Sequence, residues 1–137
     1  MAAIFVINLA RSTKRLIQTT ERLSAVNLTF KRIDAIDGNN LTVKQKKYLN
    51  YSSQLNKQKY HYALSNGQIG CYLSHRKAWQ KIVDEKLKYA IVLEDDFYID
   101  DSIHDAIKNI EQLNQPWQLI KLAAYENRTR LSPISKN

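Results

Sequence analysis

The sequence predicts an α/β fold with a mainly parallel sheet, and two features of the chain predict it. Short apolar runs rich in β-branched residues alternate with longer segments of helical periodicity. The strongest run ends abruptly in three consecutive carboxylates, Glu94-Asp95-Asp96, as expected for a buried strand that stops at the ligand-binding edge of a parallel sheet. A length of 137 residues suits one domain, so we expect a single α/β domain over residues 1–137.

The first quarter of the chain predicts a strand, a helix and a second strand. Ala3–Leu9 is a short apolar run that fits a buried strand. A helix is expected to begin at Ser12 or Thr13, either of which can cap it, and to end near Ala25. Leu28–Ile33 alternates well enough to predict the second strand.

The middle of the chain predicts a loop followed by helices. Residues 34–40 are rich in Asp, Asn and Gly and favour a loop. Thr42–Asn50 predicts a short helix, whereas Tyr51–Tyr62 fits no single element. Gly67–Lys86 predicts a long helix, because its apolar residues recur at helical spacing.

The last part predicts another strand and helix before a final apolar run. Lys88–Leu93 gives the strongest strand prediction in the sequence. Ser102 is expected to cap a helix that reaches about Leu113. Trp117–Ala124 follows a proline and is interpreted as a further core strand.

The charge distribution points to an anionic ligand. The chain carries 21 Lys and Arg against 13 Asp and Glu, for a net charge of +8. Residues 1–83 carry a net +11 and residues 84–137 a net −3. Phosphorylated small molecules and an acidic membrane surface both fit the basic part. A nucleic-acid partner is not expected, because the acidic residues between 94 and 105 would repel it.

Composition also limits the cellular setting. No run approaches the about 18 apolar residues of a membrane span, and the apolar N-terminal run is too short for a signal peptide. The single cysteine, Cys71, forms no disulfide within the chain. We therefore expect a cytoplasmic protein.

The acidic triplet is the first candidate site. Residues two apart in an extended chain point the same way, so Glu94 and Asp96 could share one target. Clustered carboxylate oxygens favour Mg²⁺, Mn²⁺ or Ca²⁺. The alternative is a solvated turn that caps the next helix, and spacing alone leaves both interpretations open.

The start of the long helix is the second candidate. Gly67 and Gly70 allow close approach of a ligand to backbone N–H groups, which favour anions. Ser74 and His75 could contact that ligand or transfer a proton, although a helical histidine is often structural. Cys71 is expected to be a small buried residue.

The end of the first strand is the third candidate. Asn8, Arg11 and Arg15 lie where the loop after a first strand would hold a phosphate. The alternative is a solvated basic face. The Lys- and Tyr-rich residues 44–60 are interpreted as a solvated or membrane-facing surface, and base stacking on the tyrosines is the alternative.

In combination and in this order, the motifs resemble glycosyltransferase family 25, the lipopolysaccharide and lipooligosaccharide glycosyltransferases of Gram-negative bacteria. The matching stretches are Ile7-Asn8-Leu9, Ala35-Ile36-Asp37-Gly38, Gly67–His75 with Trp79, Ile91–Asp96 and Trp117–Leu122.

The resemblance implies a Rossmann-like, GT-A type nucleotide-sugar-binding domain. Its implied activity is inverting transfer of a hexose, typically galactose from UDP-galactose, to a lipopolysaccharide or lipooligosaccharide saccharide. Glu94 and Asp96 would hold Mn²⁺ or Mg²⁺, which neutralises charge on the departing UDP. The general base is unassigned, with Asp95 and His75 as candidates. The residues expected to bind substrate are Asn8, Arg11, Arg15, Asp37, Gly67, Gly70, Ser74 and His75.

The chain is shorter than members of this family usually are, so we expect a domain truncated at its C-terminus. A non-catalytic module that binds nucleotide or glycan is therefore the alternative function. The basic surface predicts peripheral contact with the anionic inner membrane of a Gram-negative bacterium. An unpaired sheet edge at Trp117–Ala124 predicts self-association, most simply as a dimer.

Overall fold

The computed structural model describes residues 2–49, 51–60 and 62–122. The chain divides into two compact units, Met1–Asp100 and Asp101–Asn137, and each is described by itself. The expectation of a single nucleotide-sugar-binding domain over the whole chain stays a prediction.

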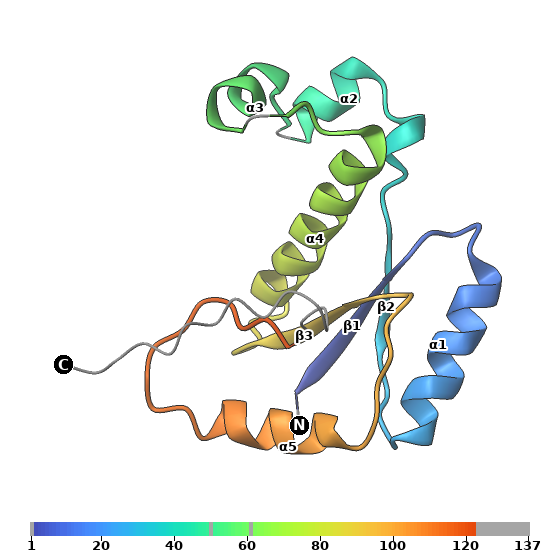
Figure 1. Cartoon of the computed structure of the whole chain (residues 1–137), viewed down its shortest axis with the longest axis vertical. Helices are drawn as coiled ribbons and strands as arrows, with labels where there is room; N and C mark the ends of the chain where they lie inside the picture. The colour runs from blue at the N-terminus through green and yellow to red at the C-terminus, as the bar shows by residue number, and fades with distance from the viewer. Residues whose placement is uncertain (1, 50, 61, 123–137) are drawn as a thin grey trace. The chain divides into compact units, whose positions relative to one another are not determined.

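A three-stranded parallel sheet forms the centre of the first unit (Figure 1). Its strands are β1 (Ala3–Asn8), β2 (Lys31–Asp34) and β3 (Ala90–Glu94), in the order β2-β1-β3. In the register of the ladder Asn8 lies opposite Asp34, and Ile7 lies opposite Glu94. All three strands therefore end at the same edge of the sheet, and each brings a polar side chain there.

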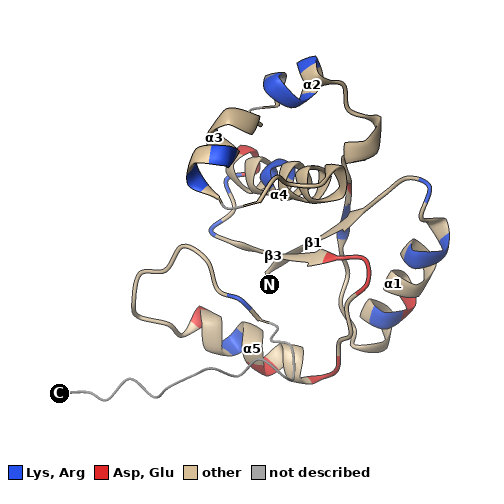
Figure 2. Ribbon diagram, turned by 45° about the horizontal axis from the view of Figure 1, so that its top comes forward, with Lys and Arg blue, Asp and Glu red and all other residues tan. Residues whose placement is uncertain are grey.

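Two helices account for the long apolar run of the central strand. Phe5 and Ile7 of β1 cluster with Ile33 and with Ala78 of α4 (Asn66–Asp84). Ile4 and Val6 point to the other face of the sheet and are also buried. On that side lies α1 (Thr13–Ala25), and Figures 1 and 2 show α1 and α4 on different sides of the strands. Burial on both faces is why β1 shows no polar alternation.

A basic helical segment connects β2 to α4. It contains the 3₁₀ turn η1 (Gly38–Asn40), α2 (Val43–Tyr48) and α3 (Ser53–Lys59). Capping boxes begin both α2 and α4, at Thr42 and Ser65, because each hydroxyl has a glutamine three residues later to complete the motif. Figure 2 shows lysines on α2 and α3, and the acidic group that directly follows β3.

The second unit contains α5 (Ser102–Glu111), whose cap residue is Asp101. The expected cap, Ser102, is instead the first residue of the helix. Trp117–Leu122 is not a strand, which corrects the expected core strand, and Ala123–Ala124 lie outside the described residues. Apolar residues alone do not make a strand without a neighbouring strand to pair with. The predicted self-association was argued from that strand and stays a prediction.

Most of the first unit agrees with the sequence prediction. The strand at Ala3–Asn8, the helix at Thr13–Ala25 and the strand at Ala90–Glu94 are confirmed within a residue or two. β2 begins at Lys31, three residues later than expected, and α3 occupies the segment that fitted no element. Among the residues that the structure describes, no helix is both long and apolar enough to cross a membrane.

Candidate functional site

An open pocket of about 190 Å³ lies at the carboxyl edge of the sheet. Its walls come from the ends of β1 and β3, the loop after β2 and the first half of α4. This edge is where parallel α/β sheets bind ligands, since the strand-to-helix loops meet there. The polar and reactive side chains among its lining residues are Arg11, Asp37, Asn39, Cys71, Ser74, His75 and Glu94.

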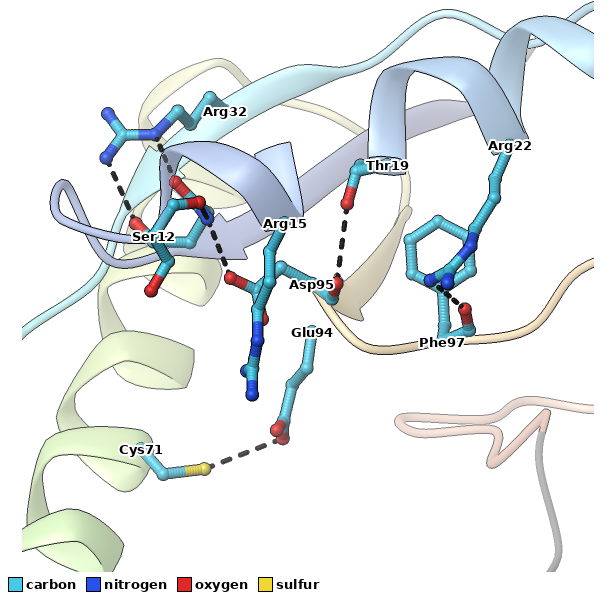
Figure 3. A network of polar contacts seen from close by, with 10 residues as sticks. Ser12, Arg15, Thr19, Arg22, Arg32, Cys71, Glu94, Asp95 and Phe97 are labelled. Carbon is cyan, nitrogen blue, oxygen red and sulfur yellow. Dashed lines mark hydrogen bonds and ion pairs between the residues drawn. The ribbon is translucent and has the colours of Figure 1, made fainter. Parts of the chain in front are cut away.

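The three carboxylates after β3 have different surroundings. Glu94 is the last residue of the strand and points toward Cys71 on α4, whereas the Asp95 carboxylate lies beside Arg15 of α1 and its backbone carbonyl faces Thr19 (Figure 3). Asp96 is exposed. The chain leaves the strand conformation after Glu94, so the two-residue alternation of an extended chain applies only up to that residue.

Asp95 joins β1 to α1. Its carboxylate accepts hydrogen bonds from Asn8 Nδ2 at 2.7 Å and from Arg15 Nη1 at 3.1 Å. Thr19 Oγ1 lies 3.5 Å from the Asp95 carbonyl oxygen. Asn8 and Asp95 are only 1% and 8% exposed, and a buried polar group needs such partners to offset its lost hydration. None of these four side chains lines the pocket.

Arg11 and Asp37 form an ion pair across the pocket mouth. Arg11 Nη1 donates to Asp37 Oδ2, joining the loop after β1 to the loop after β2. The hydrogen bond from Arg11 lowers the pKa of the Asp37 carboxyl below its usual value. Asp37 also accepts from the backbone N–H of Asn39, which fixes the start of η1. The Arg11 side chain stays 61% exposed, so it remains accessible to an anion.

The glycines of the second candidate site have different roles. A Cβ at Gly70 would lie 2.5 Å from the Ile36 carbonyl oxygen and 2.7 Å from the Gly38 backbone nitrogen. A Cβ at Gly67 would meet only the Ser65 hydroxyl, at 3.9 Å. Gly70 therefore permits close packing of α4 on the loop after β2, while Gly67 lines the pocket without such a constraint.

Ser74 lines the pocket and holds the same loop to the helix. Its Oγ accepts from the Ile36 backbone N–H at 2.8 Å and donates to the Gly70 carbonyl at 2.6 Å. The side chain is 1% exposed. These contacts explain why a hydroxyl is needed at this position, independently of any ligand.

Cys71, His75 and Glu94 bring three metal-ligating atoms together. Glu94 Oε1 lies 3.5 Å from Cys71 Sγ and 3.1 Å from His75 Nε2, and all three atoms lie within 4.8 Å of one another. The prediction that Cys71 is buried was wrong, because the residue is exposed on the pocket side of α4. Partial desolvation and then the Glu94 carboxylate raise the pKa of the Cys71 thiol.

That Glu94 and Asp96 together hold a hard divalent cation stays a prediction, and Asp96 does not line the pocket. Glu94 and Asp96 are both exposed at the end of β3 and offer carboxylate oxygens, the ligands that Mg²⁺ and Mn²⁺ prefer. Among the described residues, no hydrogen bond or ion pair holds the Asp96 carboxylate. Asp95 is different, because Asn8 and Arg15 already occupy both of its oxygens.

The structure thus separates the predicted site residues into two groups. Arg11, Asp37, Gly67, Ser74, His75 and Glu94 line one pocket, while Asn8, Arg15, Gly70, Asp95 and Asp96 do not. Their assignments to substrate, metal or catalysis stay predictions. Sequence reasoning missed that Asn39 and Cys71 line the pocket. Cys71 lies four residues before His75 on one helix, and this spacing could have indicated that the two side chains share one face.

Comparison with known proteins identifies a family. The family model described as "Glycosyltransferase family 25 (LPS biosynthesis protein)" matches residues 1–133. Human procollagen galactosyltransferase 2 is 32% identical over 131 residues, which cover 85% of this chain and 20% of that protein. A putative glycosyltransferase of Haemophilus influenzae is 29% identical over 120 residues, covering 88% of this chain and 41% of that protein.

Some relatives are named as inactive. The mouse protein called inactive glycosyltransferase 25 family member 3 is 28% identical over 135 residues, covering 95% of this chain and 22% of that protein. The chain thus spans about a fifth of the length of the mammalian relatives that it matches.

Proposed function

The chain belongs to glycosyltransferase family 25, and from this premise we propose that it carries the donor-binding part of a hexosyltransferase. The donor is a UDP-sugar, with galactose the first candidate because a relative is named as a galactosyltransferase. The acceptor is a saccharide of lipopolysaccharide or lipooligosaccharide, and transfer inverts the anomeric carbon. The observation that carries the proposal is the pocket at the carboxyl edge of the sheet, lined by both Arg11 and Glu94.

The pocket suits a nucleotide diphosphate. The exposed Arg11 guanidinium offers a forked set of donors for phosphate oxygens. Gly67 lies in the first turn of α4 and leaves the backbone there accessible to a ligand. Ile7, Leu9 and Ile36 supply the apolar part of the wall, as expected for a site that binds a ring as well as charges.

Glu94 and Asp96 would hold the divalent cation, Mn²⁺ or Mg²⁺. When bound, such a cation neutralises the charge that develops on the departing diphosphate. The surrounding residues supply the rest of the electrostatic setting. Arg11 adds a positive charge at the mouth, and Asp95 fixes the loop after β3 through its bonds to Asn8 and Arg15.

His75 is the stronger candidate for the general base. It lines the pocket, and its Nε2 lies 3.1 Å from Glu94 Oε1. If Nε2 keeps its proton and donates it to Glu94, Nδ1 is left to accept the proton of the acceptor hydroxyl. Asp95 is less suited, because it is buried and its carboxylate already accepts two hydrogen bonds.

The experiment is calorimetry of UDP binding with Mn²⁺ and with chelator, for the full chain. We expect Mn²⁺ to strengthen binding, and we expect Asp96→Asn to abolish that dependence while leaving the melting temperature unchanged. Asp84→Asn is the matched control. It removes the same charge nine residues beyond His75 on α4, about 13 Å further along the helix axis. Equal UDP affinity with and without Mn²⁺ would contradict the metal-assisted mechanism.

A non-catalytic binding module is the second candidate, favoured by the relatives named as inactive. The two functions share nucleotide binding and differ in turnover. Release of free hexose or UDP from a UDP-sugar in the presence of Mn²⁺ would support the enzyme. UDP-sugar binding without any turnover, with or without saccharide acceptor, would support the module.

A further inference from the structure

We propose that Cys71, His75 and Glu94 form a zinc-binding site in the wall of the pocket, separate in its chemistry from the carboxylate site for Mn²⁺ or Mg²⁺. Cys71 and His75 are four residues apart on α4 and so share one face of the helix. Glu94 reaches that face from the end of β3 (Figure 3). Three different donor atoms therefore converge from two elements.

The spacing of the three atoms matches zinc. With bonds of about 2.3 Å to sulfur and about 2.0–2.2 Å to nitrogen and oxygen, tetrahedral ligands lie about 3.4–3.6 Å apart. The observed separations from Glu94 Oε1 are 3.5 Å to Cys71 Sγ and 3.1 Å to His75 Nε2, and no pair exceeds 4.8 Å. Movement of these side chains, whose ligand atoms lie within 4.8 Å of one another, would complete three corners of a tetrahedron, with the fourth open to the pocket.

The ligand types select the metal. A thiolate and an imidazole favour Zn²⁺ over Mg²⁺ and Mn²⁺, which prefer oxygen ligands. Zinc would take the Cys71 sulfur as thiolate and the His75 Nε2 lone pair, releasing the thiol proton to solvent. The Glu94 carboxylate, now hydrogen-bonded to both, would become the third ligand.

Bound zinc would also change the pocket. If the proposed function holds, zinc occupies Glu94, which the donor's cation needs, and His75, which then cannot act as the general base. Zinc should then inhibit UDP binding in Mn²⁺. This consequence rests on the proposed function, whereas zinc binding itself does not.

The test measures zinc binding without nucleotide. The metal-free full chain is titrated with Zn²⁺ against a chromophoric chelator, and with Co²⁺ while thiolate-to-cobalt charge-transfer absorption is followed. We expect one Zn²⁺ per chain and a charge-transfer band. Cys71→Ser and His75→Gln should each weaken zinc at least about 10- to 100-fold, since even losing a partner of a ligand costs that much. Circular dichroism and melting curves verify folding, and Cys71→Ala replaces Cys71→Ser if serine retains the metal.

Asp84→Asn is the matched control, because it keeps all three zinc ligands and removes a carboxylate at the C-terminal end of the same helix, α4. It should keep wild-type zinc affinity. Zinc affinity unchanged in both Cys71→Ser and His75→Gln, or cobalt binding without a charge-transfer band, would overturn the zinc site. If Mn²⁺ does not strengthen UDP binding to the wild type, only the proposed function is overturned, because the zinc titration does not involve nucleotide.

Discussion

At the end of β3, three consecutive acidic residues have three different roles in the structure. Glu94 lines the pocket, Asp95 is buried against β1 and α1, and Asp96 is exposed. Of these three residues, Asp95 should contribute most to the free energy of unfolding, since it accepts hydrogen bonds from the buried amide of Asn8 and from Arg15. A carboxylate in this position stabilises the protein even where no ligand is bound.

Asp95→Ala is therefore expected to destabilise the chain by about 1–3 kcal/mol, the cost of leaving one N–H of the buried Asn8 amide unpaired while the other still donates to the Ser12 carbonyl oxygen. Asp96→Ala, which removes an exposed carboxylate next to it, should stay within about 0.5 kcal/mol of the wild type. Urea unfolding followed by circular dichroism measures both. Equal effects of the two substitutions would show that the Asn8–Asp95 contact contributes nothing to stability.

The Arg11–Asp37 pair predicts a pH-dependent contact at the pocket mouth. Arg11 holds the pKa of Asp37 below its usual value of 3.8, so Arg11→Gln should raise that pKa. The pair contributes to stability above pH 3.8, and the contribution is lost as pH falls through the lowered pKa. The effect is small, because the Arg11 side chain is largely exposed and solvent screens the pair.

An NMR titration of the Asp37 carboxyl in the wild type and in Arg11→Gln tests this contact. Lys14→Gln is the matched control, since it removes a positive charge from the exposed side of α1. A pKa of Asp37 that is the same in Arg11→Gln as in the wild type would contradict the ion pair.

At the level of elements, the sequence predicted what burial dictates. The Ala3–Asn8 and Ala90–Glu94 strands lie in a covered parallel sheet and form apolar runs, so their pattern was clear. β2 was placed less well, because only Ile33 of its four residues is buried. Trp117–Leu122 was wrongly predicted as a strand, since hydrophobicity does not reveal whether a partner strand is present.

The candidate site was predictable as a region but not in its detail. A carboxylate cluster after a strand and glycines at a helix start both indicated the edge where the pocket lies. The sequence could not tell that Asp96 stays outside the pocket that Glu94 lines, because the chain leaves the strand conformation after Glu94. Nor could it separate the packing glycine, Gly70, from the pocket glycine, Gly67.

Gly70 and Gly67 give a prediction about how α4 packs. Gly70→Ala should cost about 1–3 kcal/mol, as overpacking does, because its Cβ would lie 2.5 Å from the Ile36 carbonyl oxygen. Gly67→Ala should leave stability unchanged or slightly raised, since space is open there and alanine is the better helix former. Thermal melting of both variants compares them directly. A Gly67→Ala variant that melts lower than Gly70→Ala would contradict this assignment.

At the scale of the whole chain, charge is separated along the sequence more sharply than the totals indicate. Residues 38–83 carry eight Lys and Arg and no Asp or Glu. Within this stretch, α2 and α3 present exposed lysines at Lys44, Lys47, Lys57 and Lys59 (Figure 2). Glu94, the last residue of β3, lines the pocket in another part of the first unit, and Asp95 and Asp96 follow it. The lysine surface of α2 and α3 therefore suits an anionic ligand, whereas the carboxylate in the pocket suits a cationic one.

The α2–α3 lysines predict binding to anionic lipid. Each lysine near such a surface contributes about 1 kcal/mol, so Lys44→Gln with Lys57→Gln should lower the partition coefficient on phosphatidylglycerol vesicles about 30-fold. Lys14→Gln with Lys88→Gln removes two exposed lysines from outside this stretch and should lower the partition coefficient less.

Co-sedimentation with the vesicles at several salt concentrations measures the partition coefficient, and binding should weaken as salt shortens the screening length. Equal losses in the two double variants would assign the binding to net charge alone. Displacement from vesicles by duplex DNA at equal phosphate concentration would favour the nucleic-acid interpretation instead.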